Sequence, residues 1–266
     1  NLISQDTINY GVDLGLRQGL VQLLRELVKV ETLRWIRPFY LYPQQVTDDL
    51  LDLYAGEEKI TKYIDMPLQH INDRMLKRMH RLGDRAAIES LVDRIRTRIP
   101  MVTFRTAFIV GFPGETDAAY TELRDYVERA EFDRVAVFLY SDEEGTGAVG
   151  LDEKVERDVM DERRNEILSV QESISAAKGR AIVGSILEVL VDGRSEETEH
   201  VLEGRHEGLA PEIDGVVYID EGLSDTTPQR PARHNVSSPT PGEFCKVEIT
   251  DASAFDLVGR IVTAPV

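Results

Sequence analysis

Residues 104–116 read FRTAFIVGFPGET, an apolar run that enters a turn rich in glycine and proline and ends on an acid and a threonine. The run is rich in β-branched and aromatic residues, which favours a buried strand. Thr116 is a candidate N-cap for a following helix, and Gly111 and Gly114 allow the backbone to approach an anionic or polar ligand. The alternative is an ordinary tight turn in which Glu115 is only the acid of the first helical turn. Either way, the stretch predicts a strand, a turn and a helix.

Strands and helices alternate over the whole of residues 1–180. Strands are predicted at 1–4, 33–43, 60–70, 101–112 and 134–140, and helices at 13–30, 47–54, 116–130 and 151–180, with Asn72 and Asp84 as N-caps of two more helices. This alternation indicates a parallel sheet, either doubly wound or closed into a barrel. In both architectures ligands bind at the carboxyl ends of the strands, and those ends carry polar or glycine-rich residues here.

Beyond residue 180 the sequence changes to short β-rich runs separated by Gly, Asp and Pro. The runs cover residues 185–193, 215–220, 244–250 and 256–262. They predict a small all-β barrel or sandwich. We therefore place one domain at 1–180 and a second at 181–266, with a Pro/Ser-rich loop at 226–242 that we expect to be mobile.

Composition narrows the classes of function. With 266 residues, 42% hydrophobic and 30% charged, the chain is an ordinary folded protein, and no apolar run approaches the ~20 residues of a membrane span. We expect it in the cytoplasm. The formal net charge is −17, and residues 181–266, with 16 acidic and 6 basic residues, carry −10 of it. That balance disfavours a nucleic-acid surface and suits a basic protein partner, unless the acidity serves only solubility.

Few motifs for chemistry remain. Cys245 is the single cysteine, so the chain by itself forms no internal disulfide and ligates no iron–sulfur cluster or structural zinc. It contains no GxGxxG, P-loop or HExxH motif. Gln69 and His70 end one predicted strand, where His70 could titrate near neutral pH or be purely structural. Tyr140 ends another strand and could stack on a ligand.

Five segments occur in a recognisable order: NLISQDTINYG (1–11), YIDMPLQHINDRMLKRMHRLG (63–83), FRTAFIVGFPGET (104–116), YSDEEGT (140–146) and VDGRSEETEHVLEGRHEGLAPEIDGVVYID (191–220). The series resembles the radical S-adenosylmethionine methylthiotransferases over nearly the whole chain. The last segment is similar to the branch that modifies an aspartate of small ribosomal subunit protein twelve, rather than to the branches that modify adenosines of transfer RNA.

The resemblance implies a partial, open (βα) barrel of the radical S-adenosylmethionine type, followed by a TRAM barrel. It implies an enzyme that adds a methylthio group to the β-carbon of that aspartate, with S-adenosylmethionine, two [4Fe–4S] clusters in the full-length protein and an electron donor protein. The expected partner is the basic ribosomal protein twelve, docked on the acidic TRAM domain. Transfer RNA and membranes are not expected as partners, and the protein is expected to be a monomer. The alternatives are a transfer RNA methylthiotransferase and a non-catalytic acidic module that docks a basic ribosomal protein.

The resemblance also implies site residues, although it assigns no catalytic one. The cofactor-binding positions are Gln5, Asp6, Gln69, His70, Gly111, Phe112, Pro113, Gly114, Glu115, Phe138 and Tyr140. Arg81 and Arg105 are candidate carboxylate or substrate contacts. In the family the cluster cysteines precede the position matched by Asn1, so we expect a C-terminal portion that is inactive alone.

Overall fold

The computed structural model describes residues 1–81, 83–195, 201–220 and 239–263. The chain falls into two compact units, Asn1–Gln171 and Glu172–Val266. The loop that we expect to be mobile lies outside the described residues except for residues 239–242. None of the described helices combines the length and apolar character that crossing a membrane requires.

The first unit is built on a parallel sheet. Its strands are β1 (Tyr63–Asp65), β2 (Thr103–Val110) and β3 (Arg134–Leu139), in the order β1-β2-β3. Parallel bridges between Leu2 and Pro38 and between Ile36 and Ile60 extend the pattern beyond β1. The order in space follows the order in the chain, as in a βα barrel, whereas a doubly wound sheet reverses at a switch point. Of the two predicted architectures, the structure therefore has the open partial barrel.

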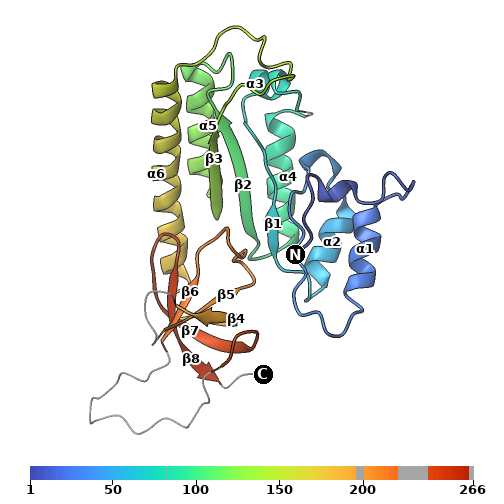
Figure 1. The fold of residues 1–266 in the computed structure, drawn as a ribbon, viewed down its shortest axis with the longest axis vertical. Coiled ribbons are helices and arrows are strands. Elements are labelled where there is room, and N and C mark those ends of the chain that lie inside the picture. Colours follow the sequence, from blue (N-terminus) through green and yellow to red (C-terminus); the bar gives the residue numbers. More distant parts are fainter. Residues whose placement is uncertain (82, 196–200, 221–238, 264–266) are drawn as a thin grey trace. The chain divides into compact units, whose positions relative to one another are not determined.

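Helices flank this sheet (Figure 1). They are α1 (Gly19–Leu27), α2 (Asp48–Gly56), α3 (Asp73–Arg78), α4 (Arg85–Arg98), α5 (Asp117–Ala130) and α6 (Arg157–Ala181), with the short 3-10 helices η1 (Thr7–Asn9) and η2 (Pro43–Gln45). The side chains of Thr47, Asn72, Asp84 and Thr116 each accept a hydrogen bond from an amide three residues on. The N-caps predicted at the last three positions are therefore confirmed.

The core of the first unit lies between β2 and the helices. Phe104 and Phe108 of β2 are fully buried and belong to one cluster with apolar residues of α4 and α5. Phe132, which precedes β3, places its ring centroid 5.1 Å from that of Phe104 and 6.1 Å from that of Phe108. These aromatic contacts anchor the helices to one face of the sheet and leave the other face for different residues.

Two predicted helices begin later than expected. The helix predicted at 13–30 starts only at Gly19, because residues 10–15 form turns in which Gly11 and Gly15 have positive φ. The helix predicted at 151–180 starts at Arg157. Upstream of it, Glu153 has a φ of 64° and its carbonyl accepts a hydrogen bond from the amide of Gly114 at 2.8 Å, which is incompatible with a continuing helix.

The strand predicted at 33–43 is wrong as a regular strand. The segment makes single bridges instead of a ladder: the Leu2 amide donates to the Arg37 carbonyl, and the Leu41 amide donates to the Asp65 carbonyl. Pro38 has no amide hydrogen, and Tyr40 has a φ of 55°, so the pairing is interrupted twice. The predicted strand at 1–4 is likewise reduced to one bridge at Leu2.

The second unit is a closed barrel with the strand order β4-β5-β6-β8-β7. Its strands are β4 (Ile186–Arg194), β5 (Val201–His206), β6 (Val217–Asp220), β7 (Phe244–Ala252) and β8 (Leu257–Thr263). Strands β6 and β8 pair in parallel and the other pairs are antiparallel. The predicted small β-barrel is confirmed. Strand β5 was not predicted, because its sequence VLEGRH holds too few apolar residues to stand out.

Gly259→Ala is expected to lower the free energy of unfolding of the barrel by about 1–3 kcal/mol. A Cβ atom at Gly259 would lie 2.4 Å from Cγ1 of Val247 and 2.8 Å from the carbonyl oxygen of Glu248, so β7 would have to move. Chemical denaturation followed by circular dichroism measures the loss. Gly193→Ala is the matched control, because a Cβ on Gly193 meets no atom within 4 Å. Equal losses in the two variants would contradict the prediction.

Candidate functional site

The turn Gly111–Glu115 connects the carboxyl end of β2 to the start of α5. Gly111 and Gly114 have φ values of 78° and 86°, in the region that favours glycine. Thr116 Oγ1 accepts a hydrogen bond from the Ala119 amide at 3.2 Å and so begins α5. The predicted strand, turn and helix are confirmed, and all five residues of the turn are buried.

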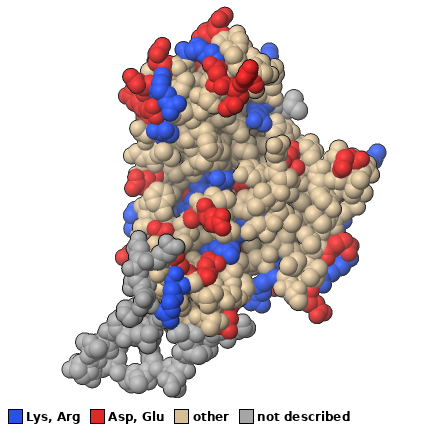
Figure 2. Space-filling view, in the orientation of Figure 1, with Lys and Arg blue, Asp and Glu red and all other residues tan. Residues whose placement is uncertain are grey.

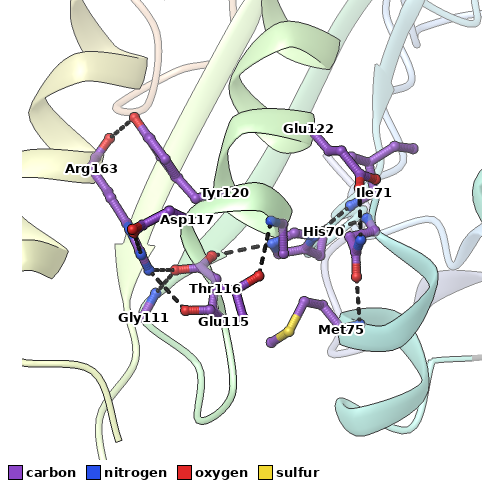
Figure 3. A network of polar contacts seen from close by, with 12 residues as sticks. His70, Ile71, Met75, Gly111, Glu115, Thr116, Asp117, Tyr120, Glu122 and Arg163 are labelled. Carbon is purple, nitrogen blue, oxygen red and sulfur yellow. Dashed lines mark hydrogen bonds and ion pairs between the residues drawn. The ribbon is translucent and has the colours of Figure 1, made fainter. Parts of the chain in front are cut away.

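The buried carboxylate of Glu115 holds this turn in place through hydrogen bonds (Figure 3). Its Oε2 accepts hydrogen bonds from the Gly111 amide at 2.7 Å and from Nη1 of Arg163 at 2.6 Å, and its Oε1 lies 3.2 Å from Nε2 of His70. The side chain is fully buried. A buried carboxylate needs such partners, because an unpaired charge in the interior is costly. Its carboxylate is therefore engaged by three groups of the chain itself.

The hydrogen bonds around His70 define its tautomer. Nδ1 accepts the amide hydrogens of Ile71 at 2.9 Å and Asn72 at 3.0 Å, so it carries no proton. The proton is on Nε2, from which it is donated to Glu115. His70 is completely buried. These contacts match the structural role weighed for His70, and direct contact with a ligand stays a prediction.

Arg163 of α6 completes the network and was missed by the sequence reasoning. Its Nη2 donates to Oδ1 of Asp117 at 2.7 Å, in addition to the Nη1 bond to Glu115. Its guanidinium carbon lies 5.2 Å from the centroid of the Tyr120 ring. The side chain is only 7% exposed, so the guanidinium supplies a buried positive charge to a buried carboxylate.

The sequence does hold a signal for Arg163. Met160, Arg163, Ile167 and Gln171 follow one another at helical spacing, and all four are buried. An arginine on the apolar stripe of a helix indicates a counter-charge in the interior. Which carboxylate serves as that counter-charge is not readable from the spacing.

Tyr120 ties α5 to α6 beside Arg163. Its hydroxyl donates to Oε2 of Glu166 at 2.7 Å and to the carbonyl of Arg163 at 3.1 Å. Burial, and then the hydrogen bond to Glu166, raise the pKa of Tyr120 above its ordinary value. The same hydrogen bond, together with Arg124, lowers the pKa of Glu166. The tyrosine therefore stays a hydrogen-bond donor over the physiological pH range.

The face of the sheet opposite the helix-packed core carries small and apolar residues near the strand ends. Because side chains alternate, Ala107 and Ile109 lie on the face opposite Phe108. The register of β2 and β3 pairs Ala107 with Ala136 and Ile109 with Phe138. Phe138 is 56% exposed. The exposed ring of Phe138 and the small side chains of Ala107 and Ala136 form an apolar surface that a flat ligand can contact.

Tyr140 follows β3 and lies beside the turn. The centroid of its ring is 5.0 Å from that of Phe112, in an edge-on arrangement, and Nζ of Lys154 lies 5.2 Å from the ring of Tyr140. The Tyr140 hydroxyl donates to Asp142 at 2.7 Å. Burial and this hydrogen bond raise the pKa of Tyr140. The structure thus brings Tyr140 together with the turn.

Gln69 also lies near the carboxyl end of β2, where the turn begins. Its amide donates to the Ala107 carbonyl at 2.8 Å, and its carbonyl accepts from the Ile109 amide at 2.9 Å. Its φ of 72° is unusual for a residue other than glycine. The backbone of Gln69 is therefore fixed against the carboxyl end of β2, with the side chain half-buried.

Gln5 and Asp6 follow the bridged residue Leu2, which lies at the edge of the sheet opposite β3. Gln5 is exposed and Asp6 is half-buried. Asp6 Oδ2 accepts a hydrogen bond from Nδ2 of Asn9 at 2.6 Å. Its Oδ1 is buried and has no hydrogen-bond partner within the described residues.

The two candidate arginines make other contacts within the chain. Arg105 is the third residue of β2, six residues before Gly111, which corresponds to about 20 Å of extended chain. Its Nη1 donates to Asp65 Oδ1 at 2.6 Å. Arg81 donates to the hydroxyl of Tyr42 at 3.1 Å and lies over its ring. Any contact of these arginines with a ligand stays a prediction.

The chain does not fit an iron–sulfur cluster. Such clusters are held by several cysteine thiolates, and the one cysteine, Cys245, is buried in β7 of the closed barrel. Across the part of the chain that the structure describes, no group of three or more His, Cys, Asp and Glu residues is arranged to hold a metal ion. These residues therefore assign no metal chemistry to the site.

The stability of the barrel is expected to fall between about pH 9 and pH 11 through Cys245. Burial raises the pKa of the Cys245 thiol from its ordinary value of 9.0 to about 11. Above pH 9 the unfolded chain loses this proton while the folded barrel keeps it, so unfolding becomes easier by up to about 3 kcal/mol. Denaturant unfolding of wild type and Cys245→Ala across this range isolates the effect, since other groups titrate equally in both. Parallel pH profiles would refute it.

The TRAM domain family matches residues 183–262, which include β4 to β7 and all of β8 except Thr263. Over 98% of its length the chain is 47% identical to the ribosomal protein uS12 methylthiotransferase RimO of Sorangium cellulosum, of which it covers 52%. It is 47% identical to the protein of that name from Anaeromyxobacter sp. (strain K), with 98% of this chain and 53% of the relative covered, and 42% identical to that of Myxococcus xanthus, with 100% and 52% covered.

Among solved structures, the coproporphyrinogen III oxidase HemN of Escherichia coli, described as a radical SAM enzyme, is matched with a TM-score of 0.44 and 16% identity. The match covers 71% of this chain and 50% of that one. The radical S-adenosylmethionine methyltransferase TsrM of Kitasatospora setae is matched with a TM-score of 0.39 and 19% identity, over 48% of this chain and 26% of that one.

An open α/β barrel followed by a closed TRAM barrel defines a protein that joins a parallel α/β sheet to an appended β-domain. Within that class, the chain belongs to the family of RimO-like methylthiotransferases. It spans about half the length of the curated relatives that it matches.

Proposed function

We propose that this chain supplies part of the cofactor site and the TRAM domain of an enzyme that adds a methylthio group to the β-carbon of an aspartate in ribosomal protein uS12. The observation that carries the proposal is the 47% identity over 98% of the chain to a relative named for that activity. Because the proposed substrate is a ribosomal protein, we place the reaction in the cytoplasm. We also propose that the enzyme is a monomer and that a separate protein donates its electrons.

The residues at the strand ends fit S-adenosylmethionine. Phe138 and Ile109 offer an apolar wall for adenine beside the turn that begins at Gly111. Asp6, with its free carboxylate oxygen, and the half-buried Gln69 offer polar contacts for the ribose or the methionyl group. When bound, S-adenosylmethionine supplies the methyl group and, after reduction, the species that takes hydrogen from the substrate.

The clusters of that chemistry need cysteine ligands that this chain does not contain. The proposal therefore assigns no cluster to these residues and expects no methylthiotransferase activity from the chain alone. The part of this chain in the reaction is to bind and orient S-adenosylmethionine and to shield one side of it from water.

The charge of the barrel supports a basic protein partner. Residues 183–195, 201–220 and 239–263 hold 11 acidic and 4 basic residues. Two of the basic residues are already paired, Arg205 with Asp192 at 2.9 Å and Arg260 with Glu248 at 2.8 Å. On the face shown in Figure 2 acidic and basic side chains are interspersed, so on that face the attraction is a sum over scattered charges and not one dense patch.

Methylthiolation is tested by joining these residues to the cluster-binding part of a relative. The assembled protein is loaded with iron and sulfide and supplied with S-adenosylmethionine, a reductant and uS12. Mass spectrometry should find added methylthio mass on one aspartate of uS12. The same mass on transfer RNA adenosine instead would overturn the proposal in favour of a transfer RNA methylthiotransferase.

A docking module without catalysis is the second candidate, favoured by the net negative charge of the barrel. It expects salt-sensitive binding of uS12 by this chain alone, because exposed charges are screened by salt. Binding of uS12 without modification by the assembled, cluster-loaded protein would select this candidate. Equal binding at low and high salt would count against it.

A further inference from the structure

We propose that Arg163 is a positioning residue for the adenosyl-binding turn, acting through Glu115. The inference rests on the proposed function for the nature of the ligand. It concerns residues outside the turn that determine whether the turn has its binding shape. Arg163 lies 48 residues beyond Glu115 in the chain and belongs to a different helix.

One carboxylate fixes the start of the turn, while Glu153 and Arg78 hold the backbone at Gly114 and Pro113. The Gly111 amide points inward to Oε2 of Glu115 at 2.7 Å, so this carboxylate fixes the backbone at the point where the chain leaves β2. Gly111 is in a left-handed conformation, and its Cβ position is blocked by the side chain of Met160, 2.3 Å away. A Glu115 that moved would release the Gly111 amide and allow the turn to change conformation.

Arg163 is what keeps Glu115 in place. It donates Nη1 both to Oε2 of Glu115 at 2.6 Å and to the Glu115 carbonyl at 3.2 Å, so it holds the side chain and the backbone of the same residue. His70 contributes a longer contact of 3.2 Å from an imidazole whose Nδ1 carries no proton. Among the described residues in contact with the Glu115 carboxylate, Arg163 therefore brings the positive charge.

The guanidinium is itself held in a fixed position. The Tyr120 ring lies against it, and the Tyr120 hydroxyl donates to the Arg163 carbonyl at 3.1 Å. Its second branch reaches Asp117, whose side chain is 98% exposed and adds little stability. These contacts connect α6, through Arg163 and Glu115, to the turn at the end of β2.

The test compares Arg163→Ala and Arg163→Lys with wild type in this chain. S-adenosylhomocysteine, an adenosyl compound that cannot react, is the probe, and its Kd is measured by calorimetry. Hydrogen exchange of the Gly111 amide is measured by NMR without ligand. In Arg163→Ala we expect the Kd to rise about tenfold and the exchange to accelerate about tenfold, as for loss of a charged hydrogen bond. Arg163→Lys, which keeps the charge but not the fork, should recover part of both.

Arg164→Ala is the control, because Arg164 is a partly exposed residue of the same helix that pairs with Asp161 instead of Glu115. It should leave both readouts at wild-type values. Wild-type Kd and exchange in Arg163→Ala would overturn the inference. If wild type binds no S-adenosylhomocysteine, the proposed cofactor site fails, and Gly111 exchange alone decides whether Arg163 positions the turn. If Arg163→Ala does not fold, Arg163→Lys decides: an increase of about threefold supports the inference and wild-type values overturn it.

Discussion

Glu115→Ala is expected to lower the free energy of unfolding of the first unit by about 3–5 kcal/mol. The substitution leaves the guanidinium of Arg163 buried without its carboxylate and removes the partner of the Gly111 amide. Trp35, the single tryptophan, lies in this unit, so its fluorescence during urea denaturation measures the loss.

The chain offers a matched control on the same arginine. Asp117 also pairs with Arg163, at 2.7 Å, but its side chain is 98% exposed. Asp117→Ala should therefore cost less than about 1 kcal/mol. The double variant Glu115→Leu/Arg163→Met should lose less stability than Glu115→Ala, since it leaves no unpaired charge in the interior. A double variant at least as unstable as Glu115→Ala would refute the electrostatic explanation.

Phe132→Ala is expected to cost about 3–5 kcal/mol in the same measurement. The Phe132 ring is fully buried and contacts the rings of Phe104, Phe108 and Tyr126, with centroids 5.1, 6.1 and 5.7 Å away. Its removal leaves a cavity where the helices pack on β2, and neighbouring rings cannot collapse into it without leaving their own contacts.

Phe138→Ala separates stability from binding. Phe138 lies on β3, only six residues beyond Phe132, yet it is 56% exposed, so its loss should change the unfolding free energy by less than about 0.5 kcal/mol. If it contacts adenine as proposed, the same variant should weaken S-adenosylhomocysteine binding about tenfold, the effect of losing a base-stacking ring. A large loss of stability with unchanged binding would mean that Phe138, like Phe132, serves the core and does not contact the ligand.

Local features of this protein were readable from the sequence. The caps at Asn72, Asp84 and Thr116, the strand–turn–helix around Gly111 and the short β-rich runs all depend on residues close together in the chain. Their signals are local because a cap or a tight turn is satisfied within about four residues. Segments that depend on distant pairing, such as residues 33–43, were predicted less well.

The candidate site divides in the same way. The sequence by itself determined that Gly111–Glu115 forms a turn at a strand end and that the second domain is β-rich and acidic. Only the tertiary structure decided that the carboxylate of Glu115 points inward, that His70 donates to it and that Arg163 balances its charge. A buried charge can take its partner from any element that packs beside it, and packing brings α6 to the turn across 48 residues of chain. Helical spacing is a signal in the sequence that Arg163 is buried, although that signal was missed, and only the packing of the fold determines its partner.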